Sequence, residues 1–164
     1  MGTVLVTGAS TGIGQSLALY LAEIGMTVYA GVRRDEDGDV LQASATGELL
    51  PVRLDVTRPD EVDAAVDAIS AAGGLTALVN NAGVYMGGPL ELMTDDEIEM
   101  TYQVNVVGLL RVTKACLPLL RESGGRIVNI SSISGLVALP GASVYAGSKH
   151  AVEAATDALR VELS

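Results

Sequence analysis

The sequence predicts an α/β fold, in which a parallel β-sheet is wound from its centre in both directions and helices cover both faces. Short apolar runs alternate along the chain with segments of helical periodicity, as in proteins built from successive β-α units. The first apolar run leads directly into a glycine-rich turn and a helix. Of all residues 49% are apolar, yet phenylalanine and tryptophan are absent, so the core must consist of Val, Leu, Ile and Ala. Such a core suits a buried parallel sheet.

The first β-α unit occupies residues 3–25. Residues 3–6 are a short β-branched apolar run, and residues 7–14 form a glycine turn. A helix of about three turns is expected to follow, with Gly25 as its carboxyl-terminal cap. Its apolar residues recur at helical spacing and are Ile13, Leu17, Tyr20, Leu21 and Ile24.

The turn at residues 7–14, TGASTGIG, is suited to a dinucleotide. Glycines tolerate positive φ and let backbone N–H groups approach a diphosphate, which the positive end of the helix dipole also favours. The spacing is Gly-x-x-x-Gly-x-Gly, whereas the common dinucleotide-binding fingerprint is Gly-x-Gly-x-x-Gly. The turn therefore matches that fingerprint in how it would bind a diphosphate and not in its glycine spacing. The alternative is a glycine-rich turn without a ligand.

Four further strands are predicted from apolar runs. They lie at residues 27–32, 50–56, 76–80 and 126–131. The polar stretch 33–39 is predicted to be the exit loop of the second strand. Helices alternate between the strands, and right-handed crossovers would then make every strand parallel to its neighbours.

The later helices carry start signals in the sequence. Thr57 is expected to cap a helix that has a proline in its first turn and acidic residues near its positive end. Thr94 and Glu97 have the spacing of a capping box and open a long helical region. The expected helical spans are 57–72, 94–120 with an interruption near 105–108, and 144–164.

The composition bounds the class of protein. The chain has 164 residues, which suit one domain (1–164) with a substantial core. Lys and Arg total 10 against 20 Asp and Glu, and the formal charge of −10 argues against binding to nucleic acid or to an anionic membrane surface. The sequence has neither a basic-plus-apolar leader nor an apolar run of about 20 residues. A cytoplasmic protein is therefore expected.

One cysteine and one histidine are present. Cys116 lies in a helical stretch and is expected to be a small buried apolar residue, not a nucleophile. His150 has no other histidine or cysteine near it in the sequence. Such a chain offers no ligand cluster, so no metal site is expected.

Tyr145 and Lys149 are the residues that most clearly suggest chemistry. The chain has only two lysines and five tyrosines, so a Tyr-x-x-x-Lys pair is uncommon by chance. On a helix, residues four apart lie on the same face, which brings the ammonium near the phenol. A nearby cation favours the phenolate, so the tyrosine can act as a general acid or base. The alternative is an ordinary exposed helical face.

Five separated elements together resemble the short-chain dehydrogenase/reductase family. They are residues 7–14 (TGASTGIG), 80–83 (NNAG), Asn105, Ser132 and the pair Tyr145-x-x-x-Lys149. Their order and separations match the family over the whole chain. The resemblance implies a Rossmann-like sheet that binds a dinucleotide at the carboxyl ends of its strands. Family members continue with further strands and a substrate lid, so the chain resembles the first two-thirds of one, with strand five as an exposed apolar edge.

The resemblance implies the catalytic roles. Tyr145 would protonate the carbonyl oxygen or deprotonate the alcohol, and Ser132 would hydrogen-bond the same oxygen. Ser131 leaves the choice of serine uncertain by one position. Lys149 would favour ionisation of Tyr145 and reach the cofactor ribose. Asn105 would hold a helix irregularity and a water on the proton path, although an asparagine within a helix can also be a solvated or back-bonded side chain.

The resemblance also assigns the cofactor contacts. Besides Tyr145 and Lys149, the assigned residues are Gly8, Ser10, Thr11, Gly12, Ile13, Gly14, Arg33, Arg34, Asp55, Val56, Asn81, Ala82 and Gly83. Asp55 would contact the adenine, and without the resemblance it would be interpreted as a turn or cap residue.

The cofactor choice depends on the end of the second strand. A protein that binds the free ribose 2′-hydroxyl usually places an acid there, whereas this chain has Val32 followed by Arg33 and Arg34. The two guanidinium groups suit a 2′-phosphate, so NADP is favoured. The alternatives are two solvated loop arginines, or NAD held by Asp35 if the strand ends later.

The function predicted is NADP-linked interconversion of a secondary alcohol and a ketone or aldehyde. Substrate recognition is expected in the loops 84–92 and 136–143, and the sequences of these loops do not identify the substrate. One alternative is a domain that binds nucleotide but is catalytically weak or silent. Another is an association module, because in the family the helices that correspond to 94–120 and 144–164 pair between subunits; a homo-oligomer is expected.

Overall fold

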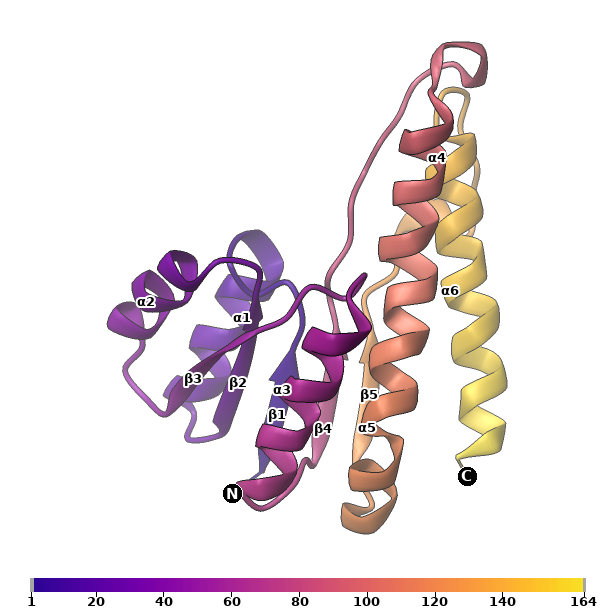
Figure 1. Ribbon diagram of the computed structural model, residues 1–164. Coiled ribbons are helices and arrows are strands. Elements are labelled where there is room, and N and C mark those ends of the chain that lie inside the picture. Colours follow the sequence, from indigo (N-terminus) through magenta and orange to yellow (C-terminus); the bar gives the residue numbers. More distant parts are fainter. Residues whose placement is uncertain (1, 164) are drawn as a thin grey trace.

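The computed structural model describes residues 2–163 and contains one five-stranded sheet, in which every strand is parallel to its neighbours (Figure 1). The strands are β1 (Thr3–Val6), β2 (Thr27–Val32), β3 (Leu49–Arg53), β4 (Ala77–Asn80) and β5 (Arg126–Asn129). Their order across the sheet is β3-β2-β1-β4-β5. The chain starts in the middle strand, builds outwards to β3 and then crosses to β4 and β5. The predicted doubly wound α/β fold is confirmed.

Within residues 2–163, six α-helices connect and follow the strands. They are α1 (Gly12–Glu23), α2 (Asp35–Ser44), α3 (Pro59–Ala71), α4 (Asp95–Tyr102), α5 (Leu109–Ser123) and α6 (Ser143–Glu162). A π-helical segment, η2 (Gln103–Gly108), joins α4 to α5. The 3₁₀ turns η1 (Leu90–Leu92) and η3 (Ile133–Gly135) lie in the loops after β4 and β5.

The sheet has a separate apolar core on each face, because alternate side chains of a strand point to opposite sides. In β1, Val4 and Val6 belong to the core under α1 and α2, whereas Leu5 belongs to the core under α3 and α5. Val, Leu, Ile and Ala fill most of both cores, as the composition predicted, and the core under α3 and α5 also contains Tyr29 and Cys116. Cys116 is fully buried in the second core, and its burial raises the pKa of the thiol to about 12, which confirms an inert apolar residue.

Two local predictions were wrong. The exit loop predicted at 33–39 is largely helix, because α2 begins at Asp35. Three acidic residues fill its first turn, where the helix dipole favours negative charge. Thr57 does not cap α3: the capping position is Arg58, and the Thr57 hydroxyl instead donates to Asp55 Oδ1 at 2.7 Å.

The buried face of α1 also differs from the apolar pattern in the sequence. Gly14, Ala18 and Ala22 are its buried residues, whereas Ile13 and Tyr20 are exposed. Small side chains let the helix approach the strands closely, so the large apolar residues are left at its outer side. Strands β3 and β5 end earlier than predicted, at Arg53 and Asn129.

The predicted capping box and helix interruption are both present. Glu97 N donates to Thr94 Oγ1, and Thr94 N donates to Glu97 Oε2 at 2.8 Å. The interruption is the π-helical η2, which contains Asn105. By length and composition alone, the continuous helix Asp95–Ser123 could cross a membrane. Its α5 part packs on α3 and β4, and its α4 part on α6, as a core helix does.

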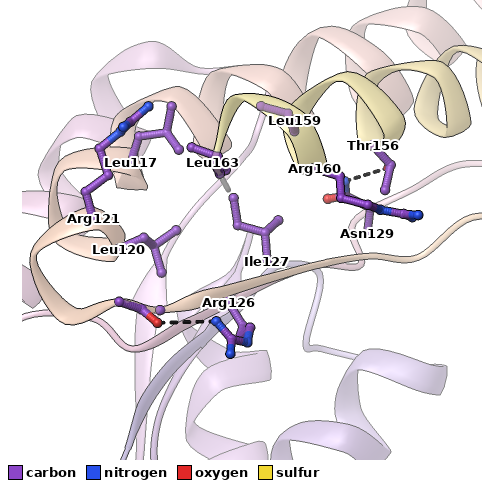
Figure 2. A pocket seen from close by; sticks show the side chains of 12 residues that line it. Leu117, Leu120, Arg121, Arg126, Ile127, Asn129, Thr156, Leu159, Arg160 and Leu163 are labelled. Carbon is purple, nitrogen blue, oxygen red and sulfur yellow. Dashed lines mark hydrogen bonds between the residues drawn. The ribbon is translucent and has the colours of Figure 1, made fainter.

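Strand β5 forms one edge of the sheet, as predicted. Val128 on this strand is 48% exposed. A hollow of about 640 Å³ opens between β5, α5 and α6 (Figure 2). Its apolar lining comes from Leu117, Leu120, Ile127, Leu159 and Leu163.

Candidate active site

The turn after β1 and the loop after β4 are held together at the carboxyl edge of the sheet. The buried Thr7 hydroxyl accepts hydrogen bonds from Asn81 N and Ala82 N, both at 3.0 Å. The Asn81 side chain donates in return to Thr7 O at 2.9 Å and to Gly8 O at 3.0 Å. The glycine turn and the NNAG run therefore form one rigid unit.

Two glycines of this turn have a positive φ, which favours glycine. Gly8 has a φ of +65°, and a Cβ there would lie 2.8 Å from Ala82 Cα, so a side chain would separate the two loops. Gly12 has a φ of +59°, and no atom lies within 4 Å of the place its Cβ would take. The turn is thus packed on one side and open on the other.

The amino terminus of α1 adjoins this open side. Thr11 is its N-cap residue but makes no side-chain cap, and the first turn contains no acidic residue. The first N–H groups of a helix have no partner within the helix. Together with the dipole they make the start of α1 a suitable anion site, which fits the diphosphate of a dinucleotide.

A second hollow, of about 450 Å³, lies beside this turn at the end of β2. It is lined by Ser10, Thr11, Arg33, Arg34 and Asp37. Arg34 is engaged there by Asp37, with Nε and Nη2 donating to the two carboxylate oxygens at 2.9 and 2.8 Å. This hydrogen-bonded contact raises the pKa of Arg34. Within residues 2–163 the Arg33 guanidinium has no such partner, so it is the arginine available to a phosphate.

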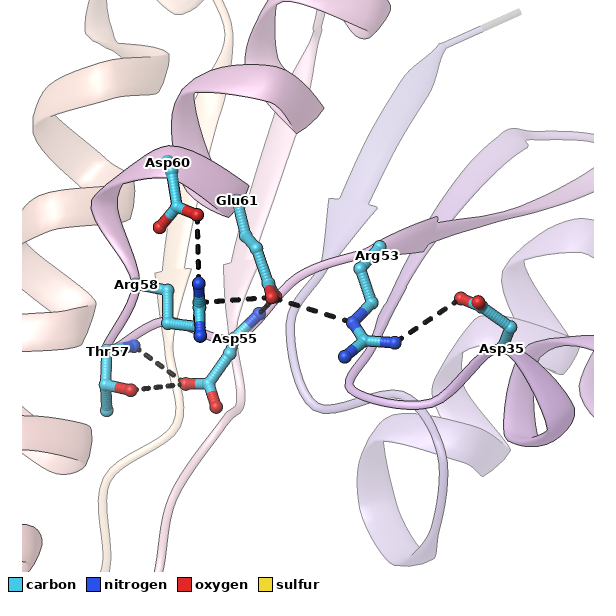
Figure 3. A network of polar contacts seen from close by, with 7 residues as sticks. All are labelled: Asp35, Arg53, Asp55, Thr57, Arg58, Asp60 and Glu61. Atoms are coloured by element: carbon cyan, nitrogen blue, oxygen red, sulfur yellow. Dashed lines mark hydrogen bonds and ion pairs between the residues drawn. The ribbon is translucent and has the colours of Figure 1, made fainter.

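Asp55 and Val56 follow β3 at the same edge of the sheet. Asp55 Oδ1 accepts from Thr57 N at 2.9 Å and from Thr57 Oγ1, while Asp55 N donates to Glu61 Oε2 at 2.8 Å (Figure 3). The alternative turn role of Asp55 is therefore present in the structure. Val56 is buried, and its carbonyl accepts from Arg111.

Ion pairs surround this turn (Figure 3). Arg58 contacts Glu61 at 3.2 Å and Asp60 at 3.1 Å, and Arg53 lies 3.7 Å from both Glu61 and Asp35. The hydrogen bond from Arg58 lowers the pKa of the exposed Asp60 carboxyl. Asp35, the residue considered for NAD, is thus turned towards Arg53.

Tyr145 and Lys149 lie one turn apart near the start of α6, as predicted. Lys149 is only 6% exposed. Its Nζ donates to Ile130 O at 2.8 Å and lies 5.9 Å from the centre of the Tyr145 ring. Burial lowers the pKa of Lys149, and the Glu153 carboxylate opposes that shift. A Cβ on Gly83 would lie 3.8 Å from Lys149 Nζ, which places the NNAG run beside the ammonium.

The two serines after β5 have different environments. Ser132 has an extended backbone, and its Oγ accepts from Ser134 N at 3.1 Å to cap η3. Ser131 Oγ is buried and has no hydrogen-bond partner among the described residues. It lies against Gly135, where a Cβ would be 2.8 Å away. The buried position of Ser131 leaves Ser132 as the candidate.

Asn105 connects three parts of the site. It is 1% exposed, so it is not a solvated side chain. Its Oδ1 accepts from Val84 N at 2.8 Å, and its Nδ2 donates to Val84 O at 2.9 Å and to Ser148 Oγ at 3.0 Å. Ser148 Oγ donates in turn to Tyr145 O at 2.7 Å. The π-helical segment, the loop after Gly83 and the start of α6 are thereby fixed to one another.

Sequence reasoning assigned no role to three residues of this region. Thr7 and Ser148 each bridge segments far apart in the chain, and Tyr85 makes an edge-to-face contact with Tyr145. Thr7 and Ser148 lie within the TGASTGIG and Tyr-x-x-x-Lys motifs, so their place in these motifs could have indicated a role. Tyr85 has no such signal. No group of three or more His, Cys, Asp and Glu able to hold a metal occurs between residues 2 and 163.

Several known proteins are similar to this chain. Residues 2–164 match the sequence model of the short chain dehydrogenase family. The chain is 38% identical to the mitochondrial D-beta-hydroxybutyrate dehydrogenase of Rattus norvegicus, with 98% of this chain and 49% of the relative covered. It is also 38% identical to the 3-ketodihydrosphingosine reductase of Bacteroides thetaiotaomicron, with 98% and 58% covered.

Solved structures give the same result. An actinorhodin polyketide ketoreductase variant crystallised with NADPH superposes with a TM-score of 0.92 at 35% identity, covering 99% of this chain and 65% of that one. The chain spans about half the length of the curated relatives it matches.

Proposed function

Because the chain belongs to the short-chain dehydrogenase family, we propose that it interconverts a secondary alcohol and a ketone or aldehyde, with NADP as cofactor. The observation that carries the proposal is the buried lysine, with its Nζ 5.9 Å from the centre of the Tyr145 ring, beside the NNAG run. A buried ammonium near a phenol favours the phenolate, so the phenol can act as a general acid or base. The family uses NAD or NADP, and the relatives named above are dehydrogenases and reductases.

Tyr145 is the residue that moves the proton. Its hydroxyl donates a proton to the carbonyl oxygen in the direction of reduction, and its phenolate accepts the proton of the alcohol in the direction of oxidation. Lys149 keeps positive charge near the phenol, and charge of that sign favours the phenolate. Ser132 Oγ hydrogen-bonds the same substrate oxygen and fixes its position. The bound cofactor supplies or accepts the hydride.

Three features of the chain fit a dinucleotide. The Gly12 turn leaves space beside the backbone, and the uncapped start of α1 suits the diphosphate. Asn81 and Ala82 adjoin this turn through Thr7, and Gly83 lies beside Lys149. Gly8, Ser10, Thr11, Ile13 and Gly14 complete the turn, and Asp55 and Val56 lie at the end of β3.

NADP is proposed over NAD because of the end of β2. Val32 is buried and apolar, so the strand does not end on the acid that a free 2′-hydroxyl would need. Arg33 lines the adjacent hollow without an ion-pair partner among the described residues, whereas Asp35 is turned towards Arg53. A guanidinium in this position suits a 2′-phosphate.

Asn105 is proposed as a positioning residue. Its three hydrogen bonds fix the loop after Gly83 and, through Ser148, the backbone of Tyr145. In the family, a water on the proton path is held at this position, and we extend that role to Asn105.

An association surface on the long helices is the second candidate, with a homo-oligomer as the state proposed. Apolar side chains are exposed along α4, η2 and α5, at Met100, Tyr102, Val107 and Leu110. Large exposed apolar patches mark interaction sites, and these side chains support that candidate. We also propose a cytoplasmic location.

Nucleotide titration tests these functions. Thermal stabilisation by NADPH together with turnover of an alcohol or ketone supports the oxidoreductase, because a ligand that binds the folded state raises the melting temperature. Stabilisation without turnover supports a nucleotide-binding domain that is catalytically silent. Association without any effect of nucleotide supports the helical interface as the main function.

A further inference from the structure

Two loops flank the candidate catalytic residues on the side away from the sheet. One follows the NNAG run at residues 84–89, and the other precedes α6 at residues 136–142. They are joined directly, because Gly88 N donates to Gly141 O at 2.8 Å. The joined loops, together with residues 132–135, are called the rim.

Tyr85 is the rim residue that contacts the catalytic tyrosine. Its ring centre lies 4.9 Å from that of Tyr145, with an angle of 79° between the ring planes, which is a favoured edge-to-face arrangement. Tyr85 is nevertheless 67% exposed. A Cβ at Gly87 would overlap the Tyr85 hydroxyl, so the glycine gives the ring its place. The ring contacts Tyr145 on one side and leaves most of its surface to solvent.

The rim is apolar and nearly free of charge. Residues 131–148 contain no charged side chain, and residues 81–94 contain only Glu91. The rim also exposes large apolar side chains at Ile133, Leu136, Val137 and Leu139. It offers no cation to neutralise a carboxylate or phosphate, and leaving such a group unpaired in an apolar site is costly.

Building on the proposed function, we propose that Tyr85 is a specificity-determining residue and that the substrate is a neutral ketone or alcohol with a flat apolar substituent. The flat substituent lies against the exposed surface of the Tyr85 ring, while the carbonyl or hydroxyl oxygen of the substrate faces Tyr145 and Ser132. Tyr85 also limits the positions that the Tyr145 ring can take, so it is a positioning residue for the catalytic group. Substrates with a carboxylate close to the carbonyl are disfavoured.

A binding experiment with NADP⁺ and a ketone separates recognition from turnover, because an oxidised cofactor and an oxidised substrate cannot react. The full chain saturated with NADP⁺ is titrated calorimetrically with acetophenone and with 4-acetylbenzoate, which share ring and carbonyl but differ in charge. We expect acetophenone to bind at least about tenfold more tightly, since an unpaired carboxylate in an apolar site loses its hydration.

Variants then test Tyr85 itself. Tyr85→Ala should weaken acetophenone binding by about three- to tenfold, the range that aromatic pairs contribute, and leave the dissociation constant of NADP⁺ unchanged. Tyr85→Phe should retain the wild-type preference because it keeps the ring. Tyr20→Ala removes an exposed tyrosine on α1 and is the matched control, with no effect on either ketone. In turnover, Tyr85→Ala should raise KM and also lower kcat, whereas loss of substrate contact alone would raise KM only.

The outcomes distinguish the two proposals. If NADP⁺ does not bind, the proposed function is wrong and this inference falls with it. If NADP⁺ binds but neither ketone does, or 4-acetylbenzoate binds as tightly as acetophenone, the inference alone is wrong. Unchanged acetophenone binding in Tyr85→Ala would likewise remove Tyr85 from substrate recognition.

Discussion

Replacing Asn105 by alanine tests the most connected side chain of the site. The substitution removes three hydrogen bonds, two to the Val84 backbone and one to Ser148 Oγ. Each contributes about 1 kcal/mol net, and a buried group left without a partner costs about 1 to 3 kcal/mol. Because Val84 is only half buried, water can replace part of what is lost there. We expect a decrease of about 3 kcal/mol in the free energy of unfolding.

The assay is urea denaturation of the chain without nucleotide, followed by circular dichroism at 222 nm. A loss of about 3 kcal/mol corresponds to a melting temperature lower by about 6 to 12 °C for a domain of this size. Gln103→Ala is the matched control, because Gln103 lies in the same π-helical segment but is exposed. Surface substitutions of that kind stay within about 0.5 kcal/mol of wild type.

Two results would refute the reasoning about Asn105. A stability within about 0.5 kcal/mol of wild type would mean that the hydrogen bonds to the loop are not made in solution. An equal decrease in the free energy of unfolding for Asn105→Ala and Gln103→Ala would mean that any substitution in η2 destabilises the chain. The hydrogen bonds of Asn105 would then not explain the effect.

Four further predictions follow from the site and the sheet edge. Tyr145→Phe should lower kcat by a factor on the order of 10² to 10⁴ and leave NADPH binding nearly intact; wild-type turnover would exclude Tyr145 from the mechanism. NADPH should bind at least about tenfold more tightly than NADH, because charge-assisted hydrogen bonds contribute about 1.5 to 3 kcal/mol. Arg33→Ala should reduce this difference in affinity more than Arg34→Ala does, since Arg34 is already paired with Asp37. Equal affinities of the wild type for NADPH and NADH would contradict the NADP assignment. Burial lowers the pKa of Lys149, so the folded chain binds fewer protons than the unfolded chain between that lowered pKa and 10.5. The free energy of unfolding of the wild type, relative to that of Lys149→Met, should therefore rise with pH across this window. Urea titrations at several pH values measure it, and a fall with pH would contradict the prediction. Val128→Lys should reduce association measured by light scattering, since lysine on an edge strand blocks pairing, and a wild-type chain that is already monomeric would show that the edge is protected.

Much of the fold could be predicted because it depends on local patterns. Apolar runs of four to seven residues marked all five strands, and the capping box at Thr94 marked the start of α4. The start of helix α2 was not recognised because its buried side consists of only Gly38 and Leu41. Two buried positions in ten residues give no helical periodicity, so the acidic stretch resembled a loop.

The site was predicted only in part, for a physical reason. Tyr145 and Lys149 lie on one helix, where spacing alone places them together. Thr7 and Asn81 are 74 residues apart, and their contact depends on how β1 and β4 pair, which no local pattern contains. Tyr85 meets Tyr145 through the path of two loops. The interruption at Asn105 was expected from the family resemblance, and no feature of a lone asparagine would have predicted a π-helical turn.

The position of β1 at the centre of the sheet has a consequence for synthesis on the ribosome. Its neighbour β2 follows within 30 residues, but its other neighbour, β4, is made only after residue 76. Until then one edge of this central strand remains unpaired in the nascent chain, although α1 and β2 are already present. Unpaired apolar strand edges are the parts of incomplete chains that aggregate. The nascent chain is therefore most vulnerable between the emergence of β2 and that of β4, and Thr7 finds its partners Asn81 and Ala82 only at the end of that interval.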